Sequence, residues 1–141
     1  MTDAREYLES IRKTELRLQM KKQQLQTLKD RLLCITPAME QELVSHTRNV
    51  GAMGDSIALI LDMEKEIDHE TKEFMLVKLK ALSLMNLIAP EHSTILIERF
   101  FEAKTFPEIG KILFVTERQA QRRLKDAVAA YQHVLNESKS H

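Results

Sequence analysis

The chain has 141 residues, with three Gly, three Pro and no Trp, and it is rich in Leu, Lys, Glu, Gln and Met, which favour helices. This composition predicts an all-α protein, with one domain or a small domain that carries a helical extension. The formal net charge is zero, which excludes the strongly basic proteins that bind nucleic acid through charge alone. No apolar run reaches the length of a membrane span, and the segment MTDAREYLES lacks the apolar core of a signal peptide, so we expect a cytoplasmic protein.

The zero net charge conceals a separation of charge along the chain. Residues 1–33 hold eight Lys/Arg against five Asp/Glu, whereas residues 34–89 hold five against nine. Residues 90–141 hold eight against seven, and within them the segment 116–125 holds four against one. Because this charge is modest, we expect DNA affinity to depend on dimerisation or on a partner that also holds DNA.

Residues 4–33 are predicted to form one long helix, because they contain no Gly or Pro and carry an apolar heptad repeat. At 1.5 Å per residue, this helix would be roughly 45 Å long. One heptad position holds Ile11, Leu18, Leu25 and Leu32, and the other holds Tyr7, Leu28 and the weaker Thr14 and Lys21.

Residues 34–54 contain Pro37, Gly51 and Gly54, and they are predicted to be a flexible connector to a second long helix over residues 55–88. The second heptad repeat consists of Ile60, Ile67, Phe74, Ala81 and Ile88, with Met63, Val77 and Leu84 at the other position. Two such helices predict a long antiparallel, coiled-coil-like hairpin over residues 1–89. Pairing of each helix with its copy in another chain is the alternative, and both together would give a four-helix bundle in a dimer.

Residues 90–141 are predicted to form a separate helix-turn-helix domain, since Ala89-Pro90 disfavours continuation of the helix. A helix over residues 91–103 would contribute Ile95, Leu96 and Phe100 to a small core. The segment from Thr105 to Tyr131 then predicts two helices joined by a tight turn. Its apolar stripe consists of Phe106, Ile109, Ile112, Leu113, Ala120, Leu124, Val128, Tyr131 and Leu135.

Each helix of this motif begins with a capping signal. Thr105 precedes Glu108 by three residues, and Thr116 precedes Gln119 by three, which is the spacing of a capping box. Pro107 is tolerated in the first turn because its missing N–H would have no partner there. The sequence therefore predicts helices that begin at these two threonines.

The second helix of the motif, residues 116–135, has a cationic face as well as an apolar face. At about 100° per residue, the residues that cluster away from the apolar side are Arg118, Gln121, Arg122 and Lys125. Arginine and glutamine side chains bind guanine and adenine edges, and lysine or arginine binds phosphate, so this face suits the major groove of DNA. The alternative is a solvated helix face that happens to be basic.

No residue pattern indicates an enzyme. The five histidines and the single Cys34 lack the spacing of metal ligands, and the chain has no phosphate-binding glycine loop, nucleophile elbow or HExxH motif. Glu66, Asp68 and Glu70 are two residues apart, which distributes them around a helix instead of gathering them at one site. We therefore expect no catalytic residue, no metal site and no cofactor.

Three segments of the chain occur in an order that is typical of one family. They are AREYLESIRKTELRLQMKKQQLQTLKDRL, IALILDMEKEID and LIERFFEAKTFPEIGKILFVTERQAQRRLKDAV, and together they cover nearly the whole chain. In this order they resemble the RinA/ArpU-type late transcription regulators, small proteins encoded by phages and mobile elements of Gram-positive bacteria. The C-terminal segment is similar to the promoter-reading fourth region of sigma factors.

The match to the sigma-like pattern extends to individual positions. Arg99-Phe100-Phe101 matches the R-Y/F element, residues 104–109 match the start of the first motif helix, and the recognition helix is matched by Arg118, Gln121, Arg122 and Lys125. The chain departs from the pattern at Gly110, where alanine is usual, and at Phe114-Val115, where the turn lacks the glycine often found in such motifs.

The resemblance implies a sequence-specific transcription regulator that binds promoter DNA of a phage or mobile element in a bacterial host, with host RNA polymerase as a further partner. The long heptad helices favour a homodimer. Two alternatives stay open: a small terminase subunit that binds packaging sites, and a coiled-coil adaptor for RNA polymerase or another protein that does not bind DNA. The candidate DNA-contacting residues are Lys104, Thr116, Arg118, Gln119, Gln121, Arg122, Arg123 and Lys125.

Overall fold

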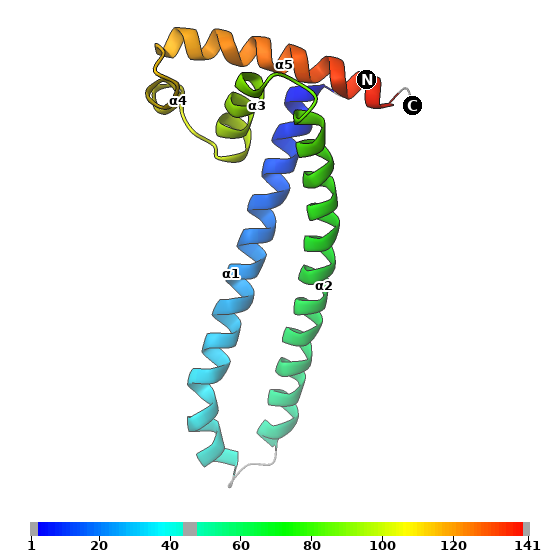
Figure 1. The fold of residues 1–141 in the computed structure, drawn as a ribbon. Coiled ribbons are helices and arrows are strands. Elements are labelled where there is room, and N and C mark those ends of the chain that lie inside the picture. Colours follow the sequence, from blue (N-terminus) through cyan, green and yellow to red (C-terminus); the bar gives the residue numbers. More distant parts are fainter. Residues whose placement is uncertain (1–2, 44–47, 140–141) are drawn as a thin grey trace. The chain divides into compact units, whose positions relative to one another are not determined.

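The computed structural model describes residues 3–43 and 48–139, with the side chains of residues 3–33 and 54–139 (Figure 1). These residues are almost entirely helical and contain no strand, which confirms the prediction of an all-α protein. The helices are α1 (Ala4–Leu43), α2 (Arg48–Met85), α3 (Pro90–Leu96), the π-helix η1 (Ile97–Phe101), α4 (Phe106–Leu113) and α5 (Glu117–Lys139).

The two long helices extend beyond their predicted limits into the connector, whereas α2 ends at Met85, before its predicted end at residue 88. Helix α1 continues to Leu43 and α2 begins at Arg48, so most of the predicted connector, residues 34–54, is helical. A glycine costs a helix interior only about 1 kcal/mol, so Gly51 and Gly54 are weak stop signals. Pro37 costs about 3 kcal/mol, and α1 nevertheless continues through it. Residues 44–47 of the predicted connector lie outside the described residues.

The helix expected over residues 91–103 is shorter and less regular than predicted. It consists of α3 followed by one turn of π-helix, and it ends at Phe101. The π-helix places Phe100 and Phe101 in the core together, with exposed fractions of 7% and 6%. Ala103 then takes a positive φ of 54° and leads the chain toward α4.

The chain forms two compact units, which differ from the predicted division at residue 90. The hairpin unit comprises Glu15–Phe74, and the terminal unit comprises Met1–Thr14 together with Met75–His141. The ends of both long helices belong to the terminal unit because they pack with the C-terminal helices. The Tyr7 and Tyr131 rings stack there at a centroid distance of 6.5 Å.

In the hairpin unit, α1 and α2 run antiparallel. Lys21 Nζ lies 2.9 Å from the Glu70 carboxylate, and further along α1 the Lys29 ammonium pairs with Glu64, which comes earlier in α2. Leu18, Leu25 and Ile67 are buried, as their heptad positions predicted. The apolar seam and the ion pairs therefore hold the same two helix faces together.

In the terminal unit, α3 and α4 lie on the same side of α5 (Figure 1). Ile95, Leu96 and Phe100 are buried, as predicted, and so are Ile109 on α4 and Tyr131 on α5. The core also contains the predicted heptad residues Ile11, Ala81 and Leu84. Three further residues of the long helices, Ala4, Leu8 and Met85, are buried there although they lie outside the predicted heptads.

Three residues expected on apolar faces are exposed. Ile112 is 41% exposed, Val77 is 45% exposed and Leu28 is 39% exposed, so the prediction that they are buried was wrong. Ile112 lies at the edge of the apolar side of α4, which has only eight residues. Periodicity gives the side of a helix on which a residue lies, but it does not determine whether another element covers that position.

Candidate nucleic-acid interface

The two predicted capping signals fix the beginnings of α4 and α5. Thr105 Oγ1 accepts a hydrogen bond from the Glu108 N–H at 3.4 Å, with Pro107 in the first turn. Thr116 Oγ1 accepts from the Gln119 N–H at 3.1 Å, and the Thr116 N–H donates to Gln119 Oε1 at 2.9 Å. The second pair is a reciprocal capping box, and both predicted caps are confirmed.

Gly110 lets the chain turn closely between α4 and α5. The Val115 N–H donates to the Gly110 carbonyl at 2.9 Å. A Cβ atom on Gly110 would lie 2.8 Å from the Val115 carbonyl oxygen, a distance that would force the backbone to shift. Phe114 ends α4 in the left-handed region, at φ 58° and ψ 43°, where glycine is the usual residue.

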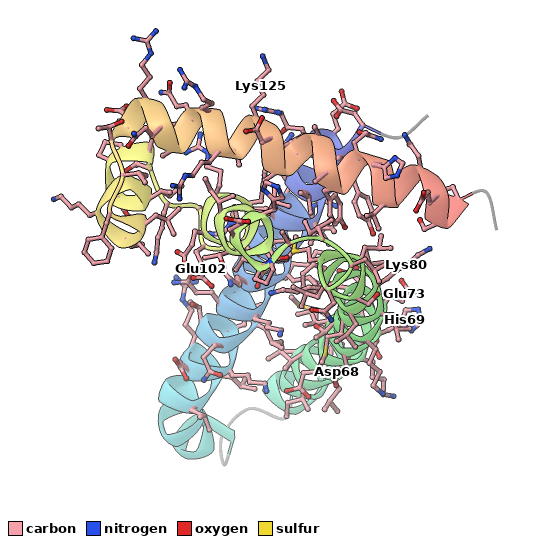
Figure 2. All side chains as sticks on the ribbon, turned by 45° about the horizontal axis from the view of Figure 1, so that its top comes forward. Asp68, His69, Glu73, Lys80, Glu102 and Lys125 are labelled. Atoms are coloured by element: carbon pink, nitrogen blue, oxygen red, sulfur yellow. The ribbon has the colours of Figure 1, made fainter. Side chains whose placement is uncertain are left out.

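Helix α5 is buried along one side and open along the other. Its buried residues are Ala120, Leu124, Ala127, Tyr131, Val134 and Leu135. Arg118, Arg122 and Lys125 are exposed and lie within about 60° of one another around the helix, on the side opposite the buried residues. Figure 2 shows Lys125 extending from α5 away from the other helices of the terminal unit.

These three cations, Arg118, Arg122 and Lys125, are called the basic stripe from here on. Within the residues that the structure describes, no ion pair or hydrogen bond holds any of them. The small, exposed Ala129 continues the same side of α5, where it leaves room for a close approach. Ala129 was not among the predicted residues, although its position seven residues after Arg122 indicates the same face of the helix.

The other candidate residues do not all join the basic stripe. Gln121 and Arg123 are both exposed, but they lie on opposite flanks of α5, about 70° and about 130° from the middle of the basic stripe. Gln121 therefore adjoins the basic stripe, whereas Arg123 faces away from it. Thr116 and Gln119 use their polar groups in the capping box, so the structure gives them a positioning role at the start of α5.

Lys104 precedes α4 and forms an ion pair with Glu98 of the π-helix η1. Its ammonium lies 2.7 Å from the Glu98 carboxylate, and this hydrogen-bonded pair raises the pKa of Lys104. Arg99 donates to the Lys104 carbonyl at 3.0 Å and lies over the Phe106 ring, 4.3 Å from its centroid. These contacts fix the segment that leads into α4. Lys104 and Arg99 both interact with other residues of the chain, unlike the cations of the basic stripe.

Tyr131 anchors α5 to the ends of both long helices. Its hydroxyl donates to the Ala81 carbonyl of α2 at 3.1 Å, and its ring stacks on Tyr7 of α1. Burial is the main reason that the pKa of Tyr131 is raised. The neighbouring Gln132 accepts a hydrogen bond from the Ala4 N–H at 2.6 Å. The basic stripe is therefore carried by a helix that is fixed along its buried side.

Among the described residues, no group of three or more His, Cys, Asp or Glu is arranged to hold a metal ion. Within the same part of the chain, no helix is both long and apolar enough to span a bilayer. Comparison of the chain with protein-family models, curated proteins and solved structures finds no significant match.

Proposed function

We propose that the protein is a sequence-specific DNA-binding transcription regulator, in which α4 and α5 act as a helix-turn-helix and α5 enters the major groove. The observation that carries the proposal is the basic stripe, which consists of three exposed cations that have no partner among the described residues and lie on one side of a capped and anchored helix. Arginine on such a helix binds guanine through two hydrogen bonds, and lysine and arginine bind backbone phosphates.

The resemblance to RinA/ArpU-type regulators gives the proposal its biological context. The DNA would be promoter DNA of a phage or mobile element, and host RNA polymerase would be a further partner. We also propose a homodimer formed through the long helices, because a chain with a net charge of zero gains affinity when two copies bind one site.

A DNA-retardation assay at several salt concentrations tests this function. We expect the affinity of the wild-type chain to fall steeply with salt, because phosphate contacts release counterions. Replacing Arg118, Arg122 and Lys125 with alanine removes up to three phosphate or base contacts. This change should abolish specific retardation, and it should reduce the slope of log affinity against log salt by up to about three units.

The matched control replaces Arg5, Lys13 and Lys80 with alanine. These three cations are exposed in the same unit but lie outside α5. Replacing them lowers the net charge by three, as the substitutions in the basic stripe do. The control should retain specific binding. Equal loss in both triple variants would mean that net charge alone governs binding and would contradict a reading role for α5.

A protein adaptor is the second candidate, and it is favoured by the zero net charge and by exposed apolar residues such as Leu76, which is 69% exposed. The same assay separates the two functions. Absence of any retardation at low salt would favour the adaptor over the regulator.

A further inference from the structure

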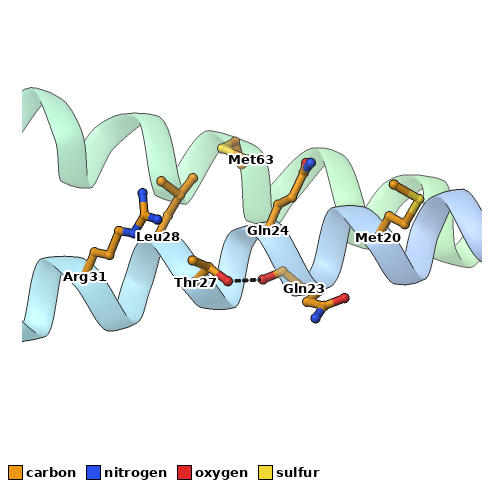
Figure 3. Close-up of a pocket in the computed structure, with 7 residues that line it drawn as sticks. All are labelled: Met20, Gln23, Gln24, Thr27, Leu28, Arg31 and Met63. Carbon is orange, nitrogen blue, oxygen red and sulfur yellow. Dashed lines mark hydrogen bonds between the residues drawn. The ribbon is translucent and has the colours of Figure 1, made fainter.

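One face of the hairpin unit carries a groove between α1 and α2. A first hollow of about 500 Å³ is lined mainly by α1 and is mixed in character (Figure 3). Its apolar residues are Met20, Leu28 and Met63, and its polar residues are Gln23, Gln24, Thr27 and Arg31. A second hollow, of about 370 Å³, adjoins it and shares Leu28 and Met63. Leu59 of α2 lines this second hollow, whose walls are almost entirely apolar.

Several large apolar side chains of this groove are exposed to solvent, although such side chains are usually buried. Leu59 is 64% exposed, Met20 is 61% exposed and Leu28, a predicted heptad residue, is 39% exposed. Covering such side chains is the main favourable term in protein association. A groove between two antiparallel helices has the shape that accepts further helices, as in a four-helix bundle.

The charges of the two helices indicate which partner fits. Residues 15–33 of α1 hold five Lys/Arg against two Asp/Glu, a net charge of +3, whereas residues 54–74 of α2 hold two against seven, a net charge of −5. Within one chain, opposite charges already pair at Lys21–Glu70 and Lys29–Glu64. The hairpin unit thus presents a basic helix beside an acidic helix.

A second copy of this hairpin is electrostatically complementary to the first. When two copies stack face to face about a two-fold axis parallel to the helices, the basic α1 of each lies against the acidic α2 of the other, and the two contacts are identical. A two-fold axis perpendicular to the helices would instead place like-charged helices together. A single foreign helix of either charge would be complementary to only one of the two helices and would be repelled by the other.

We infer that the groove between α1 and α2 is the surface through which two copies of the chain associate, as a four-helix bundle in which each α1 packs against α2 of the second copy. The inference rests on the proposed pairing of two copies, and it adds the face of the hairpin and the arrangement of the helices. It does not depend on DNA binding.

Sedimentation of the full chain without DNA tests the inference, because it measures association independently of the basic stripe. The wild-type protein should have twice the mass of the 16.4 kDa chain. Leu59→Lys places a charge in the groove and should raise the dissociation constant at least about tenfold. Leu61→Lys is the matched control, because Leu61 is 50% exposed on the same helix but does not line the groove, and it should change the dissociation constant less than about threefold.

Circular dichroism establishes that each variant keeps its helices, and Met20→Lys replaces Leu59→Lys as the groove variant if the latter does not fold. A monomeric wild-type chain at about 100 μM, or equal weakening by the groove and control variants, would overturn the inference. Raising the salt concentration should weaken the dimer, because opposite charges face each other. A dimer that salt strengthens would instead place like helices together and would also overturn it.

Discussion

At the scale of single residues, Gly110 and Phe114 determine how closely α4 and α5 approach. Gly110 is buried, and its missing Cβ leaves space for the Val115 carbonyl. Phe114 adopts a left-handed conformation, which costs a residue with a side chain about 1–2 kcal/mol, and its side chain is 94% exposed. The tight turn therefore depends on the glycine and is maintained despite the phenylalanine.

Replacing Gly110 with alanine should lower the free energy of unfolding of the terminal unit by about 1–3 kcal/mol, because the new methyl group would overlap the backbone. Gly54→Ala in α2 is the matched control. A Cβ at Gly54 meets no atom within 4 Å, so this change should raise stability by up to about 1 kcal/mol through helix propensity alone.

Urea unfolding followed by circular dichroism measures both effects. If Gly110→Ala instead stabilises the chain as much as Gly54→Ala is expected to, the turn does not depend on glycine at position 110.

At the scale of elements, the attachment of α5 depends on Tyr131. Tyr131→Phe removes the hydrogen bond to the Ala81 carbonyl and should cost about 1 kcal/mol at neutral pH. The pH dependence is more diagnostic. Burial raises the pKa of Tyr131 above its ordinary value of 10.0, so the unfolded chain releases the proton at lower pH than the folded chain does. The stability that neutral Tyr131 provides is complete below pH 10 and is lost as the pH rises further.

Denaturant unfolding between pH 8 and pH 11 tests this expectation. Above pH 10, the wild-type chain should lose up to about 1.4 kcal/mol more per pH unit than Tyr131→Phe does. Tyr7→Phe is the control, because Tyr7 is only partly buried and should contribute a smaller pH dependence. Parallel curves for the wild type and Tyr131→Phe would mean that the Tyr131 hydroxyl titrates freely.

The elements that the sequence predicted correctly are those specified by neighbouring residues. Thr116 and Gln119 are three residues apart and cap α5 directly, and the spacing of Ala120, Leu124 and Tyr131 alone placed them on one buried side. The basic stripe was predictable for the same reason, since its members lie on one helix.

The parts that the sequence did not predict depend on contacts between distant segments. The burial of Leu8 and Met85 requires α5 to pack near the ends of the long helices, and no local pattern specifies that contact. The engagement of Lys104 by Glu98 likewise depends on how the π-helix ends, which periodicity does not reveal. The sequence indicated only that Gly110 departs from a family pattern. Its requirement for a residue without a Cβ follows from the position of the Val115 carbonyl oxygen, which the sequence does not give.

At the scale of the whole molecule, we propose that the chain combines a modestly charged helix that reads DNA with a surface that pairs two copies. Two paired copies would present two basic stripes to one DNA site, which compensates for the weak non-specific attraction expected at a net charge of zero. The half-site spacing of the bound DNA would then report the distance between the two α5 helices.

Selection of bound sequences from a random double-stranded DNA pool, with the wild-type chain and Arg122→Ala in parallel, tests the central proposal most directly. We expect the wild-type chain to enrich a defined sequence. Arg122→Ala should lose discrimination at one base pair, with a cost of about 1–3 kcal/mol, if the guanidinium binds a base edge. A wild-type chain that enriches no sequence, together with no retardation of DNA at low salt, would contradict the proposal that α5 reads DNA.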